Sequence, residues 1–281
     1  MIEPPEAEVL VWLDDAEVES ALDTIFAVYG YKFHGYQQVF IKRRLRALMS
    51  ANQVSNLTEL KDRIRTDPSM YATLMDAMSI SVTEMFRDPQ MFLALRKHVV
   101  PVLQTYPFVR IWVAGCASGE EAFSLSILLS EEGMDGRFQI YATDIHEPAL
   151  VRARAGVISG AAMQLNTRNY QDAGGTSDFS RYYTAGHGMA LLGHEWRSPI
   201  LFSRHDLVQG SSFNEFQLVL CRNVMIYFDQ QLRTDVHNLL SDSLVPFGFL
   251  VLGQKESIRF SSHDRDYQPI DETHKIYKKI R

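Results

Sequence analysis

The chain has 281 residues, of which 46% are hydrophobic and 22% charged, a balance typical of a folded globular protein that excludes an intrinsically disordered one. Its 28 basic and 34 acidic residues give a formal net charge of -6, which argues against a protein whose main partner is nucleic acid. The two cysteines have no short spacing and the nine histidines no metal spacing, so we expect neither a disulfide framework nor a metal site.

The chain's first residues lack the basic and then apolar profile of a signal peptide. No apolar run approaches the roughly 20 residues that are needed to span a bilayer. We therefore expect a cytoplasmic protein that does not insert into a membrane, and we expect it to be a monomer.

Residues 1–87 have few strand signals and predict an N-terminal helical domain. One stretch carries apolar residues at helical spacing, which predicts a buried helix face: Ile41, Leu45, Leu48 and Met49. Basic residues crowd the remaining face of the same stretch: Lys42, Arg43, Arg44 and Arg46. Such a cluster is usually a solvated helix face, and by itself it predicts no partner.

Residues 88–281 alternate between apolar strand patterns and helical patterns, which predicts an α/β fold with a doubly wound, Rossmann-like sheet. The predicted strands are 111–114, 138–143, 200–203, 217–221 and 249–252, with helical stretches between the last three and an edge strand within 274–280. The predicted helices are 90–103, a helix after residue 119, 148–154 and 230–244. Residues 166–198 break the pattern and predict a small inserted antiparallel β-subdomain, with a hairpin of 182–184 and 189–192.

A glycine turn follows the first predicted strand and points to a nucleotide-like cofactor. Gly115 and Gly119 flank the turn, and Asp144 ends the second strand, 29 positions after Gly115. This spacing suits nicotinamide dinucleotides and S-adenosylmethionine alike. Glu120 and Glu121 open the next helix, where they would repel a pyrophosphate but tolerate a sulfonium and an ammonium group. The charge favours S-adenosylmethionine, and both classes stay open, as does a purely structural capping box between Ser118 and Glu121.

Four segments together resemble one protein family, in order and in spacing: SVTEMFR at 81–87, GCASGEE at 115–121, ATDI at 142–145 and CRNVMIYF at 221–228. The chain resembles, from about residue 20 to its end, the CheR family of chemotaxis-receptor glutamate methyltransferases. The last segment is highly specific, whereas the glycine turn alone is not.

The resemblance implies which residues contact S-adenosylmethionine and its product S-adenosylhomocysteine: Ser81, Thr83, Arg87, Gly115, Glu121, Asp144, Asp206, Leu207, Arg222 and Asn223. It also implies that Arg87 and Tyr227 lie around the reacting groups. Many relatives have asparagine at the position of Ser81, so that residue is the weaker candidate.

The resemblance further implies transfer of a methyl group to glutamate carboxylates in the cytoplasmic helical domain of chemoreceptors. A carboxylate with a pKa near 4 is already ionised at neutral pH, so no general base is needed. The basic stretch of Lys42, Arg43, Arg44 and Arg46 would then dock a glutamate-rich helix. Three alternatives remain: a methyltransferase for nucleic acids or small molecules, a non-catalytic binding module, and a nucleotide oxidoreductase.

Overall fold

The structure is a computed structural model that describes residues 13–79, 83–259, 261 and 263–281. The chain divides into two compact units, Met1–Ile80 and Ser81–Arg281, here called the helical unit and the sheet unit. The sequence predicts this boundary a few residues later, after Arg87. The difference arises because Met85 and Phe86 are fully buried in the core of the sheet unit.

The described part of the helical unit consists of four helices: α1 (Asp15–Tyr29), α2 (Gln38–Ala51), α3 (Leu57–Thr66) and α4 (Met70–Met78). Capping side chains begin two of them, since Asp14 accepts the N–H of Ala16 at 2.9 Å and Asn56 accepts the N–H of Glu59 at 2.9 Å. The predicted apolar face of α2 is confirmed, because all four of its apolar residues are buried.

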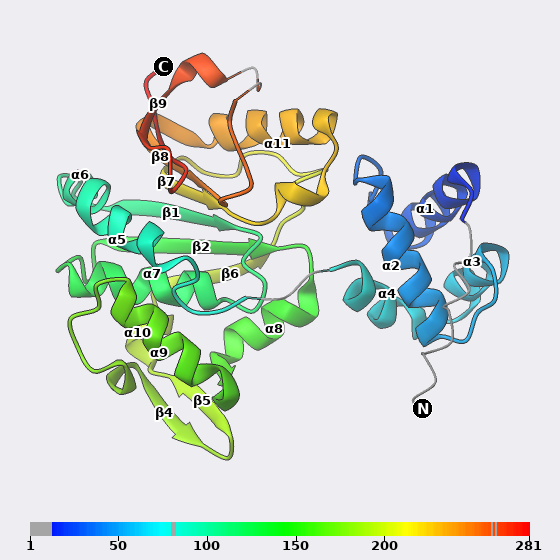
Figure 1. Cartoon of the computed structure of the whole chain (residues 1–281), viewed down its shortest axis with the longest axis horizontal. Coiled ribbons are helices and arrows are strands. Elements are labelled where there is room, and N and C mark those ends of the chain that lie inside the picture. The colour runs from blue at the N-terminus through cyan, green and yellow to red at the C-terminus, as the bar shows by residue number, and fades with distance from the viewer. Residues whose placement is uncertain (1–12, 80–82, 260, 262) are drawn as a thin grey trace, which may run out of the picture. The chain divides into compact units, whose positions relative to one another are not determined.

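The sheet unit is built on a seven-stranded sheet in the order β6-β2-β1-β7-β8-β10-β9 (Figure 1). Its strands are β1 (Val109–Ala114), β2 (Phe138–Asp144), β6 (Ile200–Arg204), β7 (Phe216–Cys221), β8 (Leu244–Leu252), β9 (Tyr267–Asp271) and β10 (Ile276–Lys279). β6, β2, β1, β7 and β8 pair in parallel, and β10 pairs antiparallel with both β8 and β9. The doubly wound sheet is thus confirmed, and its one reversed strand departs from the all-parallel order of dinucleotide-binding folds.

Two of the helices of this unit precede β1, and the others lie in the connections between the strands. The helices are α5 (Pro89–His98), α6 (Val100–Leu103), α7 (Glu120–Glu131), α8 (Glu147–Ala155), α9 (Met163–Asp172), α10 (His194–Arg197) and α11 (Gln230–Asp242). From β1 the chain runs outward in one direction through β2 to β6, and it then crosses back to β7, which pairs with the other side of β1. The strand order therefore reverses its direction between β1 and β7. Ligands of open α/β sheets bind at such a reversal, outside the carboxyl ends of the strands.

Two details of the sheet differ from the sequence prediction. The predicted edge strand, β10, lies inside the sheet, and the edge is β9, which carries Pro269. Proline lacks a ladder donor and is tolerated at an edge, which explains the position of β9. Residues 205–215 between β6 and β7 form no helix, since they fold as a turn around Asp206 and Gly210.

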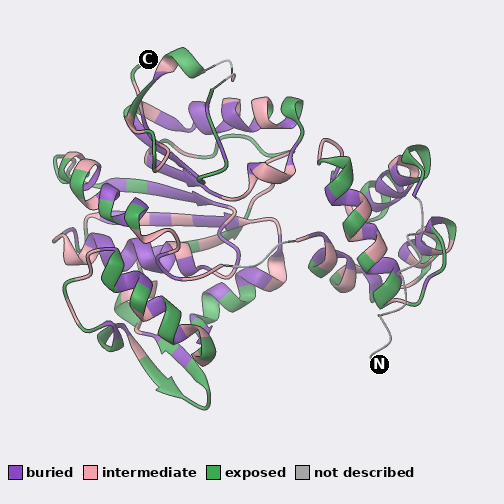
Figure 2. Cartoon of the chain, in the orientation of Figure 1, coloured by how far each residue is buried: buried purple, intermediate pink, exposed green. Residues whose placement is uncertain are grey.

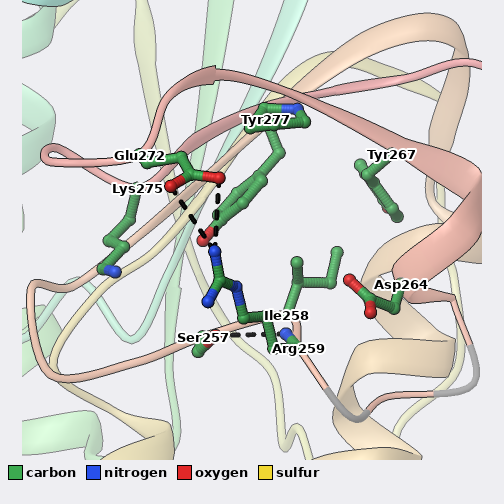
Figure 3. Close-up of a pocket in the computed structure, with 9 residues that line it drawn as sticks. Ser257, Ile258, Arg259, Asp264, Tyr267, Glu272, Lys275 and Tyr277 are labelled. Carbon is green, nitrogen blue, oxygen red and sulfur yellow. Dashed lines mark hydrogen bonds and ion pairs between the residues drawn. The ribbon is translucent and has the colours of Figure 1, made fainter.

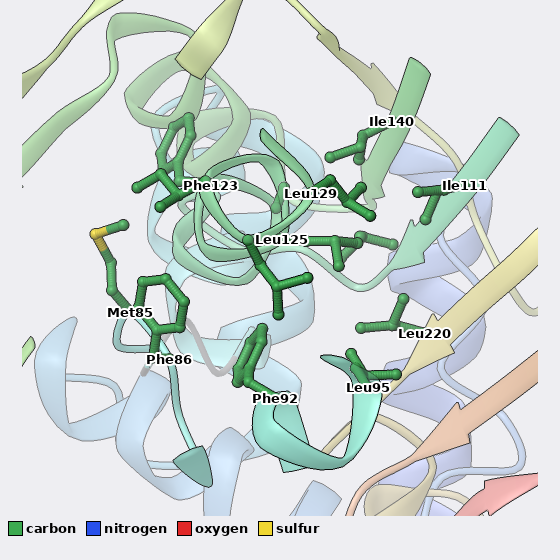
Figure 4. Packing of buried hydrophobic residues seen from close by; sticks show 14 of the residues in the cluster. Met85, Phe86, Phe92, Leu95, Ile111, Phe123, Leu125, Leu129, Ile140 and Leu220 are labelled. Atoms are coloured by element: carbon green, nitrogen blue, oxygen red, sulfur yellow. The ribbon is translucent and has the colours of Figure 1, made fainter. Parts of the chain in front are cut away.

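The main core packs α5 and α7 against the central strands. Figure 4 shows Leu125 and Leu129 of α7 facing Ile111, Ile140 and Leu220 of the sheet, with Phe92 and Leu95 of α5 beside them and Phe123 on the other side of α7, near Met85. The buried residues continue along β1 and β7 (Figure 2). A rigid sheet therefore holds the loops at its carboxyl edge.

The predicted inserted β-subdomain is present as a second, antiparallel sheet in the order β3-β5-β4. Its strands are β3 (Val157–Ser159), β4 (Tyr183–Gly186) and β5 (Met189–Leu192), and β4 with β5 form the predicted hairpin. The sheet begins before residue 166 because β3 pairs with β5. Tyr170 and Tyr182 both donate to Glu131 of α7, which ties this subdomain to the main core.

Candidate functional site

The glycine turn after β1 is bonded to β2. The N–H groups of Gly115 and Cys116 both donate to the carbonyl oxygen of Thr143, at 2.8 and 2.9 Å. Gly115 has φ +77°, and a Cβ there would overlap the side chain of Val224. Glycine therefore permits both the left-handed turn and the close packing of the segment that follows β7.

Asp144 lies at the end of β2, where the sequence predicts it, and braces this turn. Its Oδ2 accepts the N–H of Ala117 at 2.8 Å, and its Oδ1 accepts the N–H of His146 at 2.9 Å. Burial raises the pKa of Asp144, and these two N–H donors oppose that shift. Each carboxylate oxygen can accept a further hydrogen bond, so Asp144 can also bind a ligand hydroxyl.

Arg222, the first residue after β7, joins three of the predicted segments. Its side chain is only 2% exposed. One guanidinium nitrogen, Nη1, pairs with Glu121, and the other, Nη2, donates to Asp88 at 2.6 Å and to the carbonyl oxygen of Arg87 at 3.4 Å. A buried arginine that has two carboxylate partners fixes the relative positions of these segments.

This pairing shows that the capping-box interpretation of Glu121 is wrong. The N-cap of α7 is Gly119, with φ +96° and no side-chain cap bond, and Ser118 donates to Glu120 at 2.8 Å instead. Glu121 faces Arg222 at the sheet edge, so its carboxylate belongs to the site rather than to the helix end.

The segment that contains Arg87 is held by its backbone. The N–H of Phe86 donates to Ser124 Oγ at 2.8 Å, and the N–H of Met85 donates to Asn166 Oδ1 at 3.2 Å. Phe86 and Asp88, on either side of Arg87, both have left-handed φ values, of 52° and 57°. Thr83 is half-buried at the start of this segment, and Ser81 lies outside the described residues.

Asn223 belongs to a cradle that the sequence analysis missed. The buried carboxylate of Glu256, in the turn after β8, accepts four backbone N–H groups: those of Asn223 at 2.9 Å, Val224 at 2.9 Å, Met225 at 2.8 Å and Gly253 at 2.6 Å. Burial raises the pKa of Glu256 and the four donors oppose the shift. Glu256 thereby fixes the backbone of the turn that follows Arg222. An acidic residue just after a wholly apolar strand was the signal in the sequence.

The remaining predicted residues lie on neighbouring turns. Asp206 and Leu207 follow β6, where Asp206 accepts the N–H of Val208 at 2.8 Å, and the N–H of His205 donates to the carbonyl of Asp144 at 3.1 Å. Tyr227 is half-buried at the end of the 3-10 turn Met225–Tyr227, which leads into α11. The loop after β6 is thus joined to the Asp144 turn, and Tyr227 follows directly on the cradled segment.

The carboxylates at this edge of the sheet suit a cationic ligand with hydroxyl groups. Glu120, Glu121 and Asp144 place three carboxylates around the start of α7, where a pyrophosphate would be repelled. A sulfonium, an ammonium and a ribose match the same groups. Among the described residues, no group of three histidine, cysteine or carboxylate side chains could hold a metal ion.

The predicted docking residues of α2 do not share one solvated face. Lys42 pairs with Asp15 at 2.5 Å, and the guanidinium of Arg44 lies over the ring of Phe40 at 5.2 Å. Arg43 is exposed and Arg46 is half-buried. The basic cluster therefore includes two residues with structural contacts and one, Arg43, that is directed to solvent.

The doubly wound sheet with its glycine turn and acidic lining defines a class, the Rossmann-like S-adenosylmethionine-dependent methyltransferases. Residues 81–276 match the family model described as CheR methyltransferase, SAM binding domain. Residues 16–79 match the model described as CheR methyltransferase, all-alpha domain. The chain belongs to the CheR methyltransferase family, as the sequence motifs predict.

Two relatives illustrate the kinship. The chain is 42% identical, over 94% of its length and 97% of the relative, to "Putative methyltransferase Cher3" of Pseudomonas putida. It is 32% identical, over 79% of its length and 83% of the relative, to chemotaxis protein methyltransferase 1 of Pseudomonas aeruginosa. The protein is thus an S-adenosylmethionine-dependent methyltransferase of this family. Every helix in the described ranges is too short or too polar to cross a membrane.

Proposed function

We propose that this methyltransferase transfers a methyl group from S-adenosylmethionine to glutamate side-chain carboxylates in the cytoplasmic helical domain of chemoreceptors. The products are glutamyl methyl esters and S-adenosylhomocysteine. The observation that carries the proposal is the kinship with chemotaxis protein methyltransferases, to which both units of the chain contribute. The protein would act as a monomer in the cytoplasm, where that receptor domain lies.

The residues at the carboxyl edge of the sheet fit the cofactor. Asp144 would bind the ribose hydroxyls, Asp206 and Leu207 would lie near the adenine, and Glu121 would balance the cationic end. Further contacts are proposed from the resemblance: Ser81, Thr83, Arg87, Gly115, Arg222 and Asn223. When bound, the cofactor supplies a methyl group made electrophilic by its sulfonium.

The chain's own task is to orient the substrate carboxylate and to exclude water. That carboxylate is an anion at neutral pH, so no side chain has to remove a proton. Reaction between an anion and a cation neutralises both charges, and water stabilises the separated ions more than the transition state. Arg87 would orient the incoming carboxylate, since the bonds of Phe86 and the Arg222 contact hold its backbone in place. Tyr227 would wall the path of the methyl group.

The proposal is tested with labelled S-adenosylmethionine and purified receptor cytoplasmic domains, by scoring methyl groups that mild base releases. We expect base-labile label on a receptor that contains glutamates in its helical segments, and none when those glutamates are replaced by alanine. Label that resists base, or none with any receptor, would overturn the proposed substrate.

Variants of the two proposed catalytic residues test their roles separately. Arg87→Ala and Tyr227→Ala are each expected to lower turnover by about 100-fold, because misplacing reacting groups costs about that much. Calorimetry should find cofactor affinity within about threefold of the wild type for the Tyr227 variant, and a larger loss for Arg87→Ala, which also removes a proposed cofactor contact. Arg110→Ala is the control, since Arg110 is exposed at the opposite, amino end of β1. Unchanged turnover in both variants would remove Arg87 and Tyr227 from the mechanism.

A further inference from the structure

A pocket of about 170 Å³ lies between α11 and the segment that follows β8. Its lining includes Arg233 of α11, Lys255 and Arg259 of the following segment, and Met225 and Ile226. The last two belong to the turn that ends at Tyr227. The pocket therefore shares a wall with the proposed catalytic turn.

The charge of this lining is positive. Its one carboxylate, that of Glu256, accepts hydrogen bonds from four backbone N–H groups. Lys255 and Arg233 have no ion-pair partner within the described ranges. The guanidinium of Arg233 donates one hydrogen bond, from Nε to the carbonyl oxygen of Met225 at 3.1 Å. The net charge of the lining favours an anionic group.

The neighbouring pocket differs from this one in the charge of its lining. It has a volume of about 310 Å³ and balances Arg259 and Lys275 against Asp264 and Glu272 (Figure 3). Arg259 reaches from its backbone towards Glu272, at 3.3 Å, so it lies between the two pockets and is partly neutralised by the second. The balanced charges of that pocket select no sign of ligand, whereas the smaller pocket does.

His237 also lines the smaller pocket and does not alter its charge at neutral pH. Burial lowers the pKa of His237 to about 4, and the nearby Arg233 and His263 act in the same direction. The positive charge is therefore that of Arg233, Lys255 and Arg259, and it stays constant over the neutral range.

We infer that this pocket binds a second carboxylate of the glutamate-rich substrate segment and so helps to align that segment beside Tyr227. This inference rests on the proposed function, because it takes the acidic receptor helix as the occupant. The carboxylate of one residue would enter the pocket while another glutamate of the same segment reaches the reacting groups. The pocket's volume and charge suit a side-chain carboxylate, and its position on the Met225–Tyr227 turn couples this binding to the reaction.

The test measures binding and turnover separately. Fluorescence anisotropy at low salt follows a labelled helical peptide of glutamate and alanine as it binds to the full chain, and receptor methylation gives KM and kcat. Lys255→Glu is expected to raise the peptide Kd and the receptor KM about fivefold, and Lys255→Glu with Arg259→Glu about tenfold or more, because charge reversal adds repulsion. Lys255→Arg keeps the positive charge and should leave the peptide Kd and the receptor KM at their wild-type values. Arg110→Glu is the matched control, since it reverses an exposed charge at the far end of the sheet.

The outcomes separate this inference from the proposed function. If the double variant binds the peptide and methylates receptors with wild-type Kd and KM, the inference is overturned, whatever the wild type does with receptors. If the double variant loses peptide binding while neither it nor the wild type methylates any receptor, the carboxylate-binding subsite stands and the proposed substrate fails. Binding of inorganic phosphate more tightly than the peptide would also overturn the assignment to a peptide carboxylate.

Discussion

The cradle around Glu256 makes Glu256→Gln the most informative single substitution. Glutamine has nearly the same shape, and its one remaining oxygen can still accept the N–H groups of Val224 and Met225. Its amide nitrogen would then face the N–H groups of Asn223 and Gly253, which are donors as well. The exchange thus removes two hydrogen bonds and leaves two buried donors without an acceptor.

The magnitude follows from those two bonds. A hydrogen bond to a charged group contributes about 1.5–3 kcal/mol, so their loss lowers the free energy of unfolding by about 3–6 kcal/mol. Because the affected N–H groups belong to the turn after Arg222, the affinity for S-adenosylmethionine should fall as well, by about tenfold. Urea unfolding of the full chain gives the first quantity, and calorimetry of cofactor binding gives the second.

Glu272→Gln is the matched control, since Glu272 is 64% exposed and pairs with Arg259 at the surface. It should change the free energy of unfolding by less than about 0.5 kcal/mol, as surface pairs usually do. If Glu256→Gln were as mild as this control, the four-donor cradle would not fix the turn and our reasoning about Asn223 would fail.

Three further predictions rest on other parts of the molecule. Gly115→Ala should cost about 1–3 kcal/mol more than Gly133→Ala in urea unfolding, because both have left-handed φ but only the first overlaps Val224; equal costs would refute the close packing. In the folded chain the pKa of His237 is lowered to about 4. As the pH falls below about 6.5, the unfolded chain therefore binds a proton at His237 that the folded chain does not. The free energy of unfolding should consequently drop by about 2 kcal/mol between pH 7.5 and 5. His237→Gln should lack that part of the drop, and an unchanged pH dependence would contradict it. Arg43→Glu should raise the receptor KM several-fold without changing kcat in methylation assays, because Arg43 is the exposed member of the α2 cluster; an unchanged KM would remove α2 from docking.

The sequence predicts the parallel strands and the turns at their carboxyl ends well, because short apolar runs and glycine turns are local signals. Parallel strands bring their carboxyl ends together, so Gly115 and Asp144 are expected at one place without any knowledge of packing. The partners of Arg222 are different, because Asp88 lies 134 positions away and Glu121 lies 101 away. No local pattern encodes such pairs, and a local rule instead assigned Glu121 to a helix cap.

The same limit explains what was missed elsewhere. The cradle of Glu256 depends on backbone donors from two turns, which become neighbours only when β7 and β8 pair. The place of β10 inside the sheet depends on β9, whose weak strand pattern contains a proline. On α2 the helical spacing identified the buried face, but the contacts of Lys42 and Arg44 come from packing within the unit.

The proposed function is tested most directly by locating the transferred methyl group. A receptor cytoplasmic domain is incubated with the wild-type chain and S-adenosylmethionine, digested, and mapped by mass spectrometry before and after mild base. We expect methyl groups on glutamate side chains within the helical segments, all removed by base and about 100-fold slower to form with Arg87→Ala. Methyl groups on lysine or another residue that survive base would contradict a glutamate O-methyltransferase.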